Sequence, residues 1–318
     1  MQRVLTTVTL LGLLVATAAA FAITEHLKLI KSPIYGVVIS AGHSTGRRPL
    51  PAIFSPVCNC PTSVARIRLR LRHPERVTVT IVDKDDHAVA TVADNRLLGA
   101  HGPQHFPWDG HNDAGALVPD GVYRPWVQVG DHKFRFENKI TVDTVQPKVL
   151  HATRLKPVLF AGPGRTVAIH YVLSEDAHPL LYLGNRQISS GRHTRPSGKI
   201  KWSGRLNHRP LRAGRYVLSI GAVDRAGNET PAAERMHVTV DVRYVELSPD
   251  RITVRSGRPF TVHVKTAARR YTWRLGHRHG QRRGRVLRLR APSTPGTYRL
   301  VVAESGQATT AVVKVRAK

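Results

Sequence analysis

Sulfur-containing, aromatic and acidic residues are all scarce in this chain. The 318 residues include 2 cysteines, 2 methionines and 6% aromatic residues. Two cysteines are too few for a disulfide-built scaffold, which excludes that fold class. Aspartate and glutamate number 21 against 49 lysines and arginines, so the formal net charge is +28. A surface of that sign attracts polyanions such as nucleic acid, anionic lipid headgroups or acidic wall polymers.

Catalytic motifs are also missing from the sequence. It contains no Ser/His/Asp arrangement, nucleophile elbow, glycine-rich phosphate loop or zinc-ligand spacing. The 17 histidines are dispersed. Glu175 and Asp176 lie at a strand break rather than in an acid/base pair. We therefore predict that the chain is not an enzyme and holds neither a cofactor nor a metal.

The one long uncharged run lies at the N-terminus. Residues 4–23 carry no charge and follow Arg3, and Ala20-Phe21-Ala22 fits a signal-peptidase site. The run is also long enough to span a bilayer as a helix. Residues 1–24 are thus expected to be a cleaved signal peptide or a membrane anchor. Both alternatives place the remaining chain outside the cytoplasm.

The remaining sequence has the pattern of strands and turns. Residues 65–72 alternate strictly between apolar side chains and arginine, as in a half-buried strand. Similar short strands follow at the spacing of a sandwich. We predict an all-β fold of tandem immunoglobulin-like antiparallel β-sandwiches, preceded by one N-terminal hydrophobic helix. The expected segments are a linker over 25–51 and sandwiches over 52–145, 146–243 and 244–318, the last strongly basic.

One motif recurs along the chain. Its two clear copies and a weaker third one are Trp108, Gly110, Gly121 and Tyr123; Trp202, Gly204, Gly214 and Tyr216; and Trp273 with Tyr298. The three tyrosines are 93 and 82 residues apart, about the length of one immunoglobulin-like sandwich. The recurring residue types are tryptophan, glycine and tyrosine, which turns and cores require. We therefore expect the motif to build the fold rather than bind a ligand.

The first copy also resembles a known module. Phe54-Ser55-Pro56, the strand ending at Asp83, Trp108-Asp109-Gly110 and Pro119-Asp120-Gly121-Val122-Tyr123 are similar to the Ig-like domain of flagellar hook-capping (FlgD-type) proteins. The resemblance covers residues 52–145 and implies a non-catalytic module of bacterial surface and secreted proteins. The second sandwich resembles it more loosely. A flagellar role is not implied, because the chain lacks a hook-assembly segment.

The resemblance breaks down after Pro56. Family members often carry a calcium-type loop there, whereas this chain has Val57-Cys58-Asn59-Cys60-Pro61, so calcium is not carried over. Cys58 and Cys60 leave three alternatives open: a local disulfide, unpaired small residues, or a soft-metal site completed by a residue such as His73 or His87.

Two groups of aspartates offer oxygen ligands for a hard cation. They are Asp83, Asp85 and Asp86, and Asp109, Asp113 and Asp120. Turns are rich in aspartate, so we expect turn chemistry at both places. Among the four tryptophans, Trp126 breaks the repeat and is the candidate exposed aromatic.

Positive charge is concentrated toward the C-terminus. Residues 244–318 contain 17 lysines and arginines against three acids, a net +14. A basic turn is expected over 276–285, where the candidate polyanion contacts are Arg278, Arg282, Arg283 and Arg285, and where His277 and His279 flank the first of them.

The predicted function is that of an extracytoplasmic, non-catalytic structural or binding protein of the bacterial cell envelope, holding anionic wall polymer or membrane. Export argues against nucleic acid as the partner. A carbohydrate-binding or adhesion module using Trp126 is one alternative, and an accessory subunit of a secretion or appendage machine is another.

Overall fold

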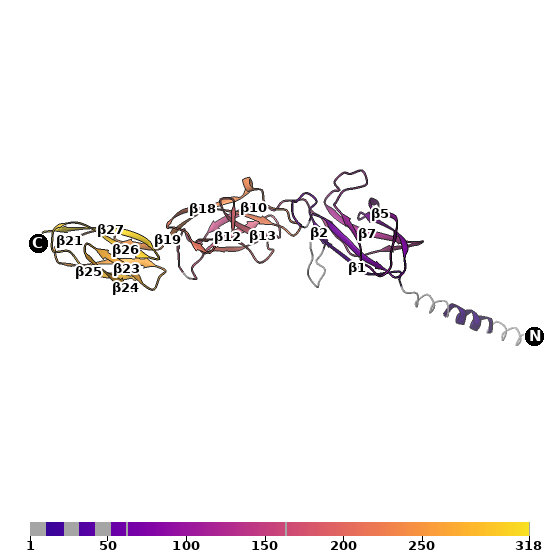
Figure 1. Cartoon of the computed structure of the whole chain (residues 1–318), viewed down its shortest axis with the longest axis horizontal. Helices are drawn as coiled ribbons and strands as arrows, with labels where there is room; N and C mark the ends of the chain where they lie inside the picture. The colour runs from indigo at the N-terminus through magenta and orange to yellow at the C-terminus, as the bar shows by residue number, and fades with distance from the viewer. Residues whose placement is uncertain (1–10, 22–31, 42–51, 62, 163, 318) are drawn as a thin grey trace, which may run out of the picture. The chain divides into compact units, whose positions relative to one another are not determined.

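The computed structural model describes residues 11–21, 32–41, 52–61, 63–162 and 164–317. It divides into two compact units, Met1–Thr144 and Val145–Lys318. Residues 11–21 form the predicted N-terminal helix (Figure 1). Within the described ranges, no helix has both the length and the apolar character needed to cross a membrane. Residues 1–10 and 22–24 of the predicted signal or anchor lie outside the described residues.

The first unit contains one β-sandwich. Its three-stranded sheet has the order β1-β3-β6, and its larger sheet has the order β2-β9-β7-β4-β5 with β8 on β7. These strands are β1 Ile34–Ala41, β2 Ala52–Phe54, β3 Ala65–Leu71, β4 Glu75–Val82, β5 Ala88–Leu98, β6 Gln104–Trp108, β7 Gly121–Val129, β8 His132–Arg135 and β9 Ile140–Val142. The predicted alternation of buried and outward-facing side chains in β3 is confirmed, because Ala65, Ile67, Leu69 and Leu71 are fully buried.

The sandwich begins earlier than the sequence predicts. The prediction assigned residues 25–51 to a linker, but β1 pairs antiparallel with β3. Ile34 and Ile39 are buried in the core. The register shifts between Tyr35 and Val38, and Gly36 in this bulge has φ +62°. Such a bulge breaks the two-residue period, which is why the alternation of a strand is not visible there.

The second unit contains two further pairs of sheets. The first pair has the orders β10-β12-β15 and β11-β19-β18-β13-β14, and the second has β20-β22-β25 and β21-β27-β26-β23-β24. The strands of the first pair are β10 Val149–Arg154, β11 Val158–Phe160, β12 Val167–Leu173, β13 His178–Leu183, β14 Arg186–Ser190, β15 Ser197–Trp202, β18 Gly214–Val223 and β19 Met236–Arg243, with the small hairpin of β16 Arg205–Leu206 and β17 Arg209–Pro210. Those of the second pair are β20 Val245–Ser248, β21 Arg251–Arg255, β22 Pro259–Thr266, β23 Tyr271–Leu275, β24 Arg278–Arg282, β25 Val286–Arg290, β26 Gly296–Glu304 and β27 Gln307–Arg316.

All three sandwiches share one topology. In each, a short strand pairs parallel with the last strand of the large sheet: β2 with β9, β11 with β19 and β21 with β27. The other pairings in the sheets are antiparallel. The fold class is therefore all-β, with tandem immunoglobulin-like sandwiches after an N-terminal helix, as predicted.

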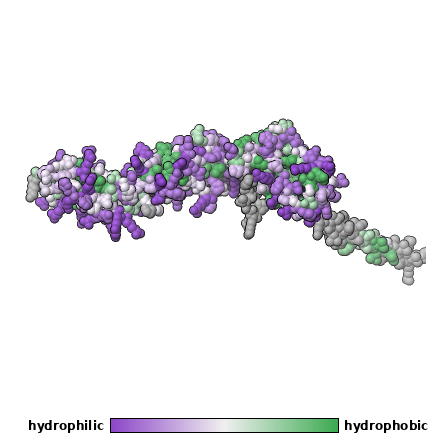
Figure 2. Space-filling view, viewed as in Figure 1, coloured by the Kyte–Doolittle hydropathy of each residue, from purple (hydrophilic) through white to green (hydrophobic). Residues whose placement is uncertain are grey.

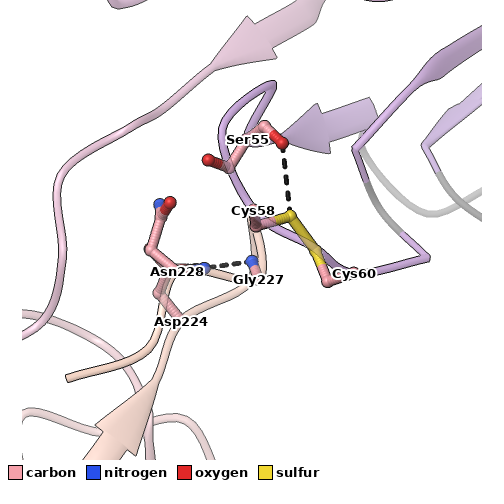
Figure 3. Close-up of a disulfide and its surroundings, with 6 residues drawn as sticks. All are labelled: Ser55, Cys58, Cys60, Asp224, Gly227 and Asn228. Atoms are coloured by element: carbon pink, nitrogen blue, oxygen red, sulfur yellow. Dashed lines mark hydrogen bonds between the residues drawn. A yellow bond between two sulfur atoms is a disulfide. The ribbon is translucent and has the colours of Figure 1, made fainter. Parts of the chain in front are cut away.

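Two buried polar residues fix the loop between β18 and β19. Asp224 Oδ1 accepts from the backbone N–H groups of Gly227 (2.7 Å) and Asn228 (2.8 Å), drawn in Figure 3. Thr230 is 1% exposed, and its hydroxyl donates to Pro147 O at 2.6 Å while accepting from Ala222 N at 2.9 Å. One hydroxyl thus satisfies two buried backbone groups.

Replacing Thr230 with valine is expected to lower the free energy of unfolding of the second unit by about 2 kcal/mol. The valine keeps the shape but leaves a buried carbonyl and a buried N–H without their partner. Urea denaturation measures the change. The control is Thr253→Val, because Thr253 is exposed in β21 and its replacement is expected to be neutral. Equal midpoints for the two variants would contradict the assignment.

Candidate functional site

The first copy of the recurrent motif forms a packed aromatic cluster. Trp108 is 2% exposed and makes edge contacts with Phe54 at 5.6 Å and Tyr123 at 5.2 Å between ring centroids. Its Nε1 donates to His111 O at 2.9 Å, and the Tyr123 hydroxyl donates to Pro119 O at 2.7 Å. Burial raises the pKa of Tyr123. Both polar groups are satisfied within the turn, so neither is offered to a ligand.

The second copy repeats this geometry. Trp202 and Tyr216 make an edge contact at 6.1 Å, and Trp202 Nε1 donates to Arg205 O at 3.1 Å. The Tyr216 hydroxyl donates to Arg212 O at 2.9 Å, four residues earlier, as Tyr123 does. Tyr298 of the third sandwich donates to Thr294 O in the same way. The recurrent tyrosine therefore closes the turn before its strand in all three sandwiches.

The tryptophan of the third copy does not correspond to the other two. Trp108 and Trp202 lie in β6 and β15 of the three-stranded sheets, whereas Trp273 lies in β23 of a five-stranded sheet. The strand in the equivalent position is β25, which contains no aromatic residue. The prediction that Trp273 belongs to a third copy of the motif is thus wrong. Its indole packs beneath Gly280 of the neighbouring strand instead, where an added Cβ would come within 3.1 Å of Nε1.

The aspartates serve turns. Asp83 Oδ1 accepts from the backbone N–H groups of Asp85 and His87, each at 2.9 Å. Burial alone would raise the pKa of Asp83, but these two donors hold it below its ordinary value. The side chains of Asp83, Asp85 and His87 lie within 4.8 Å of one another, with no further observation that indicates a cation.

The other three aspartates are used separately rather than converging. Asp113 accepts from Thr91, Asp120 accepts from Thr144, and Asp109 accepts from the backbone of His111. Only the bond from His111 to Asp109 is a local turn contact. Asp113 and Asp120 instead accept from residues 22 and 24 positions away in the sequence, so they tie their loops to distant segments.

Cys58 and Cys60 are joined by a disulfide, with a Cα–Cα distance of 5.2 Å. Figure 3 shows the bridge beside Ser55, whose carbonyl oxygen lies 3.2 Å from Cys58 Sγ. The first of the three alternatives is thus the one present. The bonded sulfurs leave no thiolate for a metal site with His73 or His87.

Trp126 is not the exposed aromatic that the sequence predicts. It lies in β7, half-buried, and pairs with Arg135 of β8. The guanidinium carbon of Arg135 lies 4.6 Å from the centre of the Trp126 ring. The guanidinium therefore covers one face of the ring, on which a sugar would otherwise stack.

The basic segment is a strand rather than the predicted turn. Residues 278–282 form β24, the edge strand of a five-stranded sheet, in which Arg278 pairs with Leu275 and Arg282 with Tyr271. Arg283 and Arg285 follow the strand on either side of Gly284, which has φ +89°. All four candidate arginines are exposed. His277 lies in the hairpin turn before the strand, and His279 faces Arg274.

The basic character extends over the whole C-terminal sandwich. Its strands alternate between buried apolar and exposed, often basic, residues, as in β25 (Val286, Arg288 and Arg290 exposed; Leu287 and Leu289 buried). Figure 2 shows a mostly hydrophilic surface on the visible face of this sandwich. In its described residues, carboxylates meet basic groups within 4.0 Å at one place, where Glu246 lies beside Arg243 and Lys265. Most of the positive charge therefore faces solvent without compensation.

A group of buried tyrosines makes the folding stability of the second unit depend on pH in alkali. The hydroxyl of Tyr182 donates to Glu229, and Arg235 lies 3.6 Å above its ring. Burial, then the bond to Glu229 and its charge, raise the pKa of Tyr182 far above the ordinary value. Burial also raises the pKa of Tyr171, Tyr244 and Tyr271.

We expect the buried tyrosines to make the second unit less stable above about pH 10 and to leave its stability unchanged below that pH. The unfolded tyrosines ionise near pH 10, while the folded ones hold their protons to higher pH, so alkali favours the unfolded chain. Urea midpoints at pH 9 and pH 11 measure the fall. Tyr182→Phe should show a smaller fall than wild type. An equal fall in both proteins would contradict the assignment.

Comparison with known proteins leaves the family open. No protein-family model matches the chain, and no curated protein matches it. A titin I-band fragment, I67-I69, is similar over 91% of this chain and 100% of its own, at 10% identity and TM-score 0.28. The Bacteroides ovatus protein SGBP-B, solved with a mixed-linkage heptasaccharide, is 14% identical over 91% of this chain and 71% of its own, at TM-score 0.24. The N-terminal four Ig domains of Dscam1 isoform 6.9 are 11% identical over 89% and 73%, at TM-score 0.21.

Proposed function

We propose that this chain is a non-catalytic binding protein of the bacterial cell envelope, whose C-terminal sandwich holds an anionic wall polymer or membrane surface. The observation that supports it is the basic segment of Arg278, Arg282, Arg283 and Arg285. These guanidinium groups are exposed, and among the described residues none lies within 4.0 Å of a carboxylate. Uncompensated charge of one sign attracts a partner of the other sign.

The proposal places the protein outside the cytoplasm. Residues 1–24 then act as signal peptide or anchor, as their sequence indicates. The disulfide between Cys58 and Cys60 supports this location, because disulfides persist mainly in oxidising compartments.

We also infer that the first sandwich is a module of the FlgD type. The motif residues behind that resemblance contact one another across the sequence. Phe54 packs on Trp108, and Gly110 lies so close to Pro56 that an added Cβ would be 2.4 Å from its Cγ. In this proposal the first two sandwiches act as spacers for the basic third one.

Salt dependence tests the binding proposal. The full-length protein would be titrated with soluble poly(glycerol phosphate), and separately with vesicles of phosphatidylglycerol and phosphatidylcholine, from 50 to 500 mM NaCl. We expect affinity to fall steeply with salt, because exposed charges are screened within about 10 Å at 0.1 M ionic strength. Binding that does not change with salt, or no binding to either probe, would overturn the proposal.

A further inference from the structure

A cavity beside the basic segment is lined by arginines from three separate stretches of the second unit. Its volume is about 890 Å³. Its basic lining residues are Arg165, Arg269, Arg270, Arg283 and Arg285. Arg165 follows the loop at Gly162, which contacts Ala267 closely enough that an added Cβ would lie 2.9 Å from its side chain. The sequence separates Arg165 from the others by about a hundred residues, so only folding brings them together.

The basic residues that line this cavity outnumber its acids by five to one. Of its lining residues, Glu304 is the one acid, and its Oε1 accepts from the neighbouring Ser305 hydroxyl at 2.6 Å. Within the part of the chain that the structure describes, none of the five arginines lies within 4.0 Å of a carboxylate. Like charges gathered in a concave space raise the local potential, and an anion entering it relieves their repulsion.

The cavity continues along the surface. A second cavity of about 470 Å³ is lined by Arg270, Gln281, Arg282 and Arg283. The two share Arg270 and Arg283, so they adjoin. Their combined lining contains six arginines, which we call the arginine-lined track: Arg165, Arg269, Arg270, Arg282, Arg283 and Arg285. Six cationic side chains can contact several anionic groups of one chain, rather than a single small ion.

The arginines that line the cavities suit a phosphate group. Every cation lining the two cavities is arginine, and none is lysine. The planar guanidinium matches the oxygens of a phosphate with two parallel hydrogen bonds, which the point charge of lysine does not do. A bilayer presents its headgroups in a plane, whereas these groups line a hollow.

Resting on the proposed function, we propose that this arginine-lined track, completed by Arg165, Arg269 and Arg270, is the site that binds the phosphate groups of an anionic wall polymer.

The test compares two triple variants with equal loss of charge, each made in the full-length protein. One is Arg165→Gln, Arg269→Gln and Arg270→Gln, in the track. The other is Arg251→Gln, Arg255→Gln and Arg299→Gln, exposed residues of β21 and β26 on the outer face of the five-stranded sheet. We expect the track triple to weaken binding to poly(glycerol phosphate) about tenfold more than the outer-face triple, because it removes paired hydrogen bonds as well as charge.

A third variant keeps the positive charge but removes the planar guanidinium group and its paired donors. With Arg165, Arg269 and Arg270 all changed to lysine, binding to the polymer should still weaken several-fold, since lysine offers no paired donors. This variant also decides the question if the glutamine triple fails to fold, which circular dichroism and a thermal melt would show.

Three results would overturn the track while leaving the proposed function intact: equal losses in the two glutamine triples, wild-type affinity in the lysine triple, or a larger loss for phosphatidylglycerol vesicles than for the polymer. If the wild-type chain binds neither probe, the proposed function itself fails, and the track fails with it.

Discussion

Replacing Gly110 with alanine will lower the free energy of unfolding of the first unit by about 3 kcal/mol. Gly110 has φ +84°, a left-handed conformation that costs an L-residue about 1–2 kcal/mol. An added Cβ would also lie 2.4 Å from Pro56 Cγ and 3.4 Å from the Phe54 ring. Forced overlap in a packed site costs a further 1–3 kcal/mol, roughly. Both penalties fall on the turn after Trp108, where Gly110 packs against Pro56 and Phe54.

Substitutions at two nearby glycines separate the cost of the backbone conformation from the cost of the steric overlap. Gly115 has φ +75° but nothing within 4 Å of a built Cβ, so Gly115→Ala should cost only about 1 kcal/mol from the backbone. Gly121 needs no positive φ and has its nearest neighbour at 3.9 Å, so Gly121→Ala should change stability by less than about 0.5 kcal/mol. The measurement is amide hydrogen exchange. Protection of β3 reports the stability of the first unit, and protection of β27 in the second unit is the internal reference. Equal costs at the three positions would refute the packing role of Gly110.

Changing Arg278, Arg282, Arg283 and Arg285 together to glutamine will reduce affinity for poly(glycerol phosphate) on the order of a hundredfold. Each exposed charge pair contributes about 0.2–1 kcal/mol, so four pairs near the upper end of that range sum to about 3 kcal/mol, and 1.4 kcal/mol is a factor of ten. Arg278 Nη1 also donates to Arg290 O at 3.1 Å, so the folding of the variant must be checked by a thermal melt.

The matched control removes the same charge from the first unit. Arg68, Arg70, Arg96 and Lys133 are exposed there, and their change to glutamine also lowers the net charge by four. Binding isotherms at one salt concentration compare the two quadruple variants. We expect the control to lose less than about fivefold, since its four residues belong to the first unit and none of them is part of the basic segment. Similar losses in both would show that net charge, rather than the basic segment, governs binding.

Several structural features on which these experiments depend were predictable from local sequence patterns. Strict alternation in residues 65–72 places the arginines of β3 outward and its aliphatic residues in the core, because side chains of a strand point to opposite faces in turn. The recurrence of Trp202 and Tyr216 after Trp108 and Tyr123 predicted a repeated turn, and both copies have the same hydrogen bonds. The excess of positive charge in the last sandwich was likewise visible in the sequence.

Other features depended on contacts between distant segments. The bulge at Gly36 hid β1 within the predicted linker, and only its pairing with β3 identifies it as a strand. Arg135 covers Trp126 through the register of two paired strands, which a lone tryptophan after a proline does not indicate. Trp273 matched the repeat in sequence but lies in the other sheet.

The sequence by itself determined many of the strands and turns, although not β1 or β24, and the sign of the charge on the C-terminal sandwich, since these depend on neighbouring residues and on composition. Only the tertiary structure decided which charges gather in a hollow. Arg165 joins Arg269 and Arg270 because packing brings the loop at Gly162 against Ala267. No periodicity encodes a contact across a hundred residues, because a periodic pattern specifies which face is buried but not what covers it.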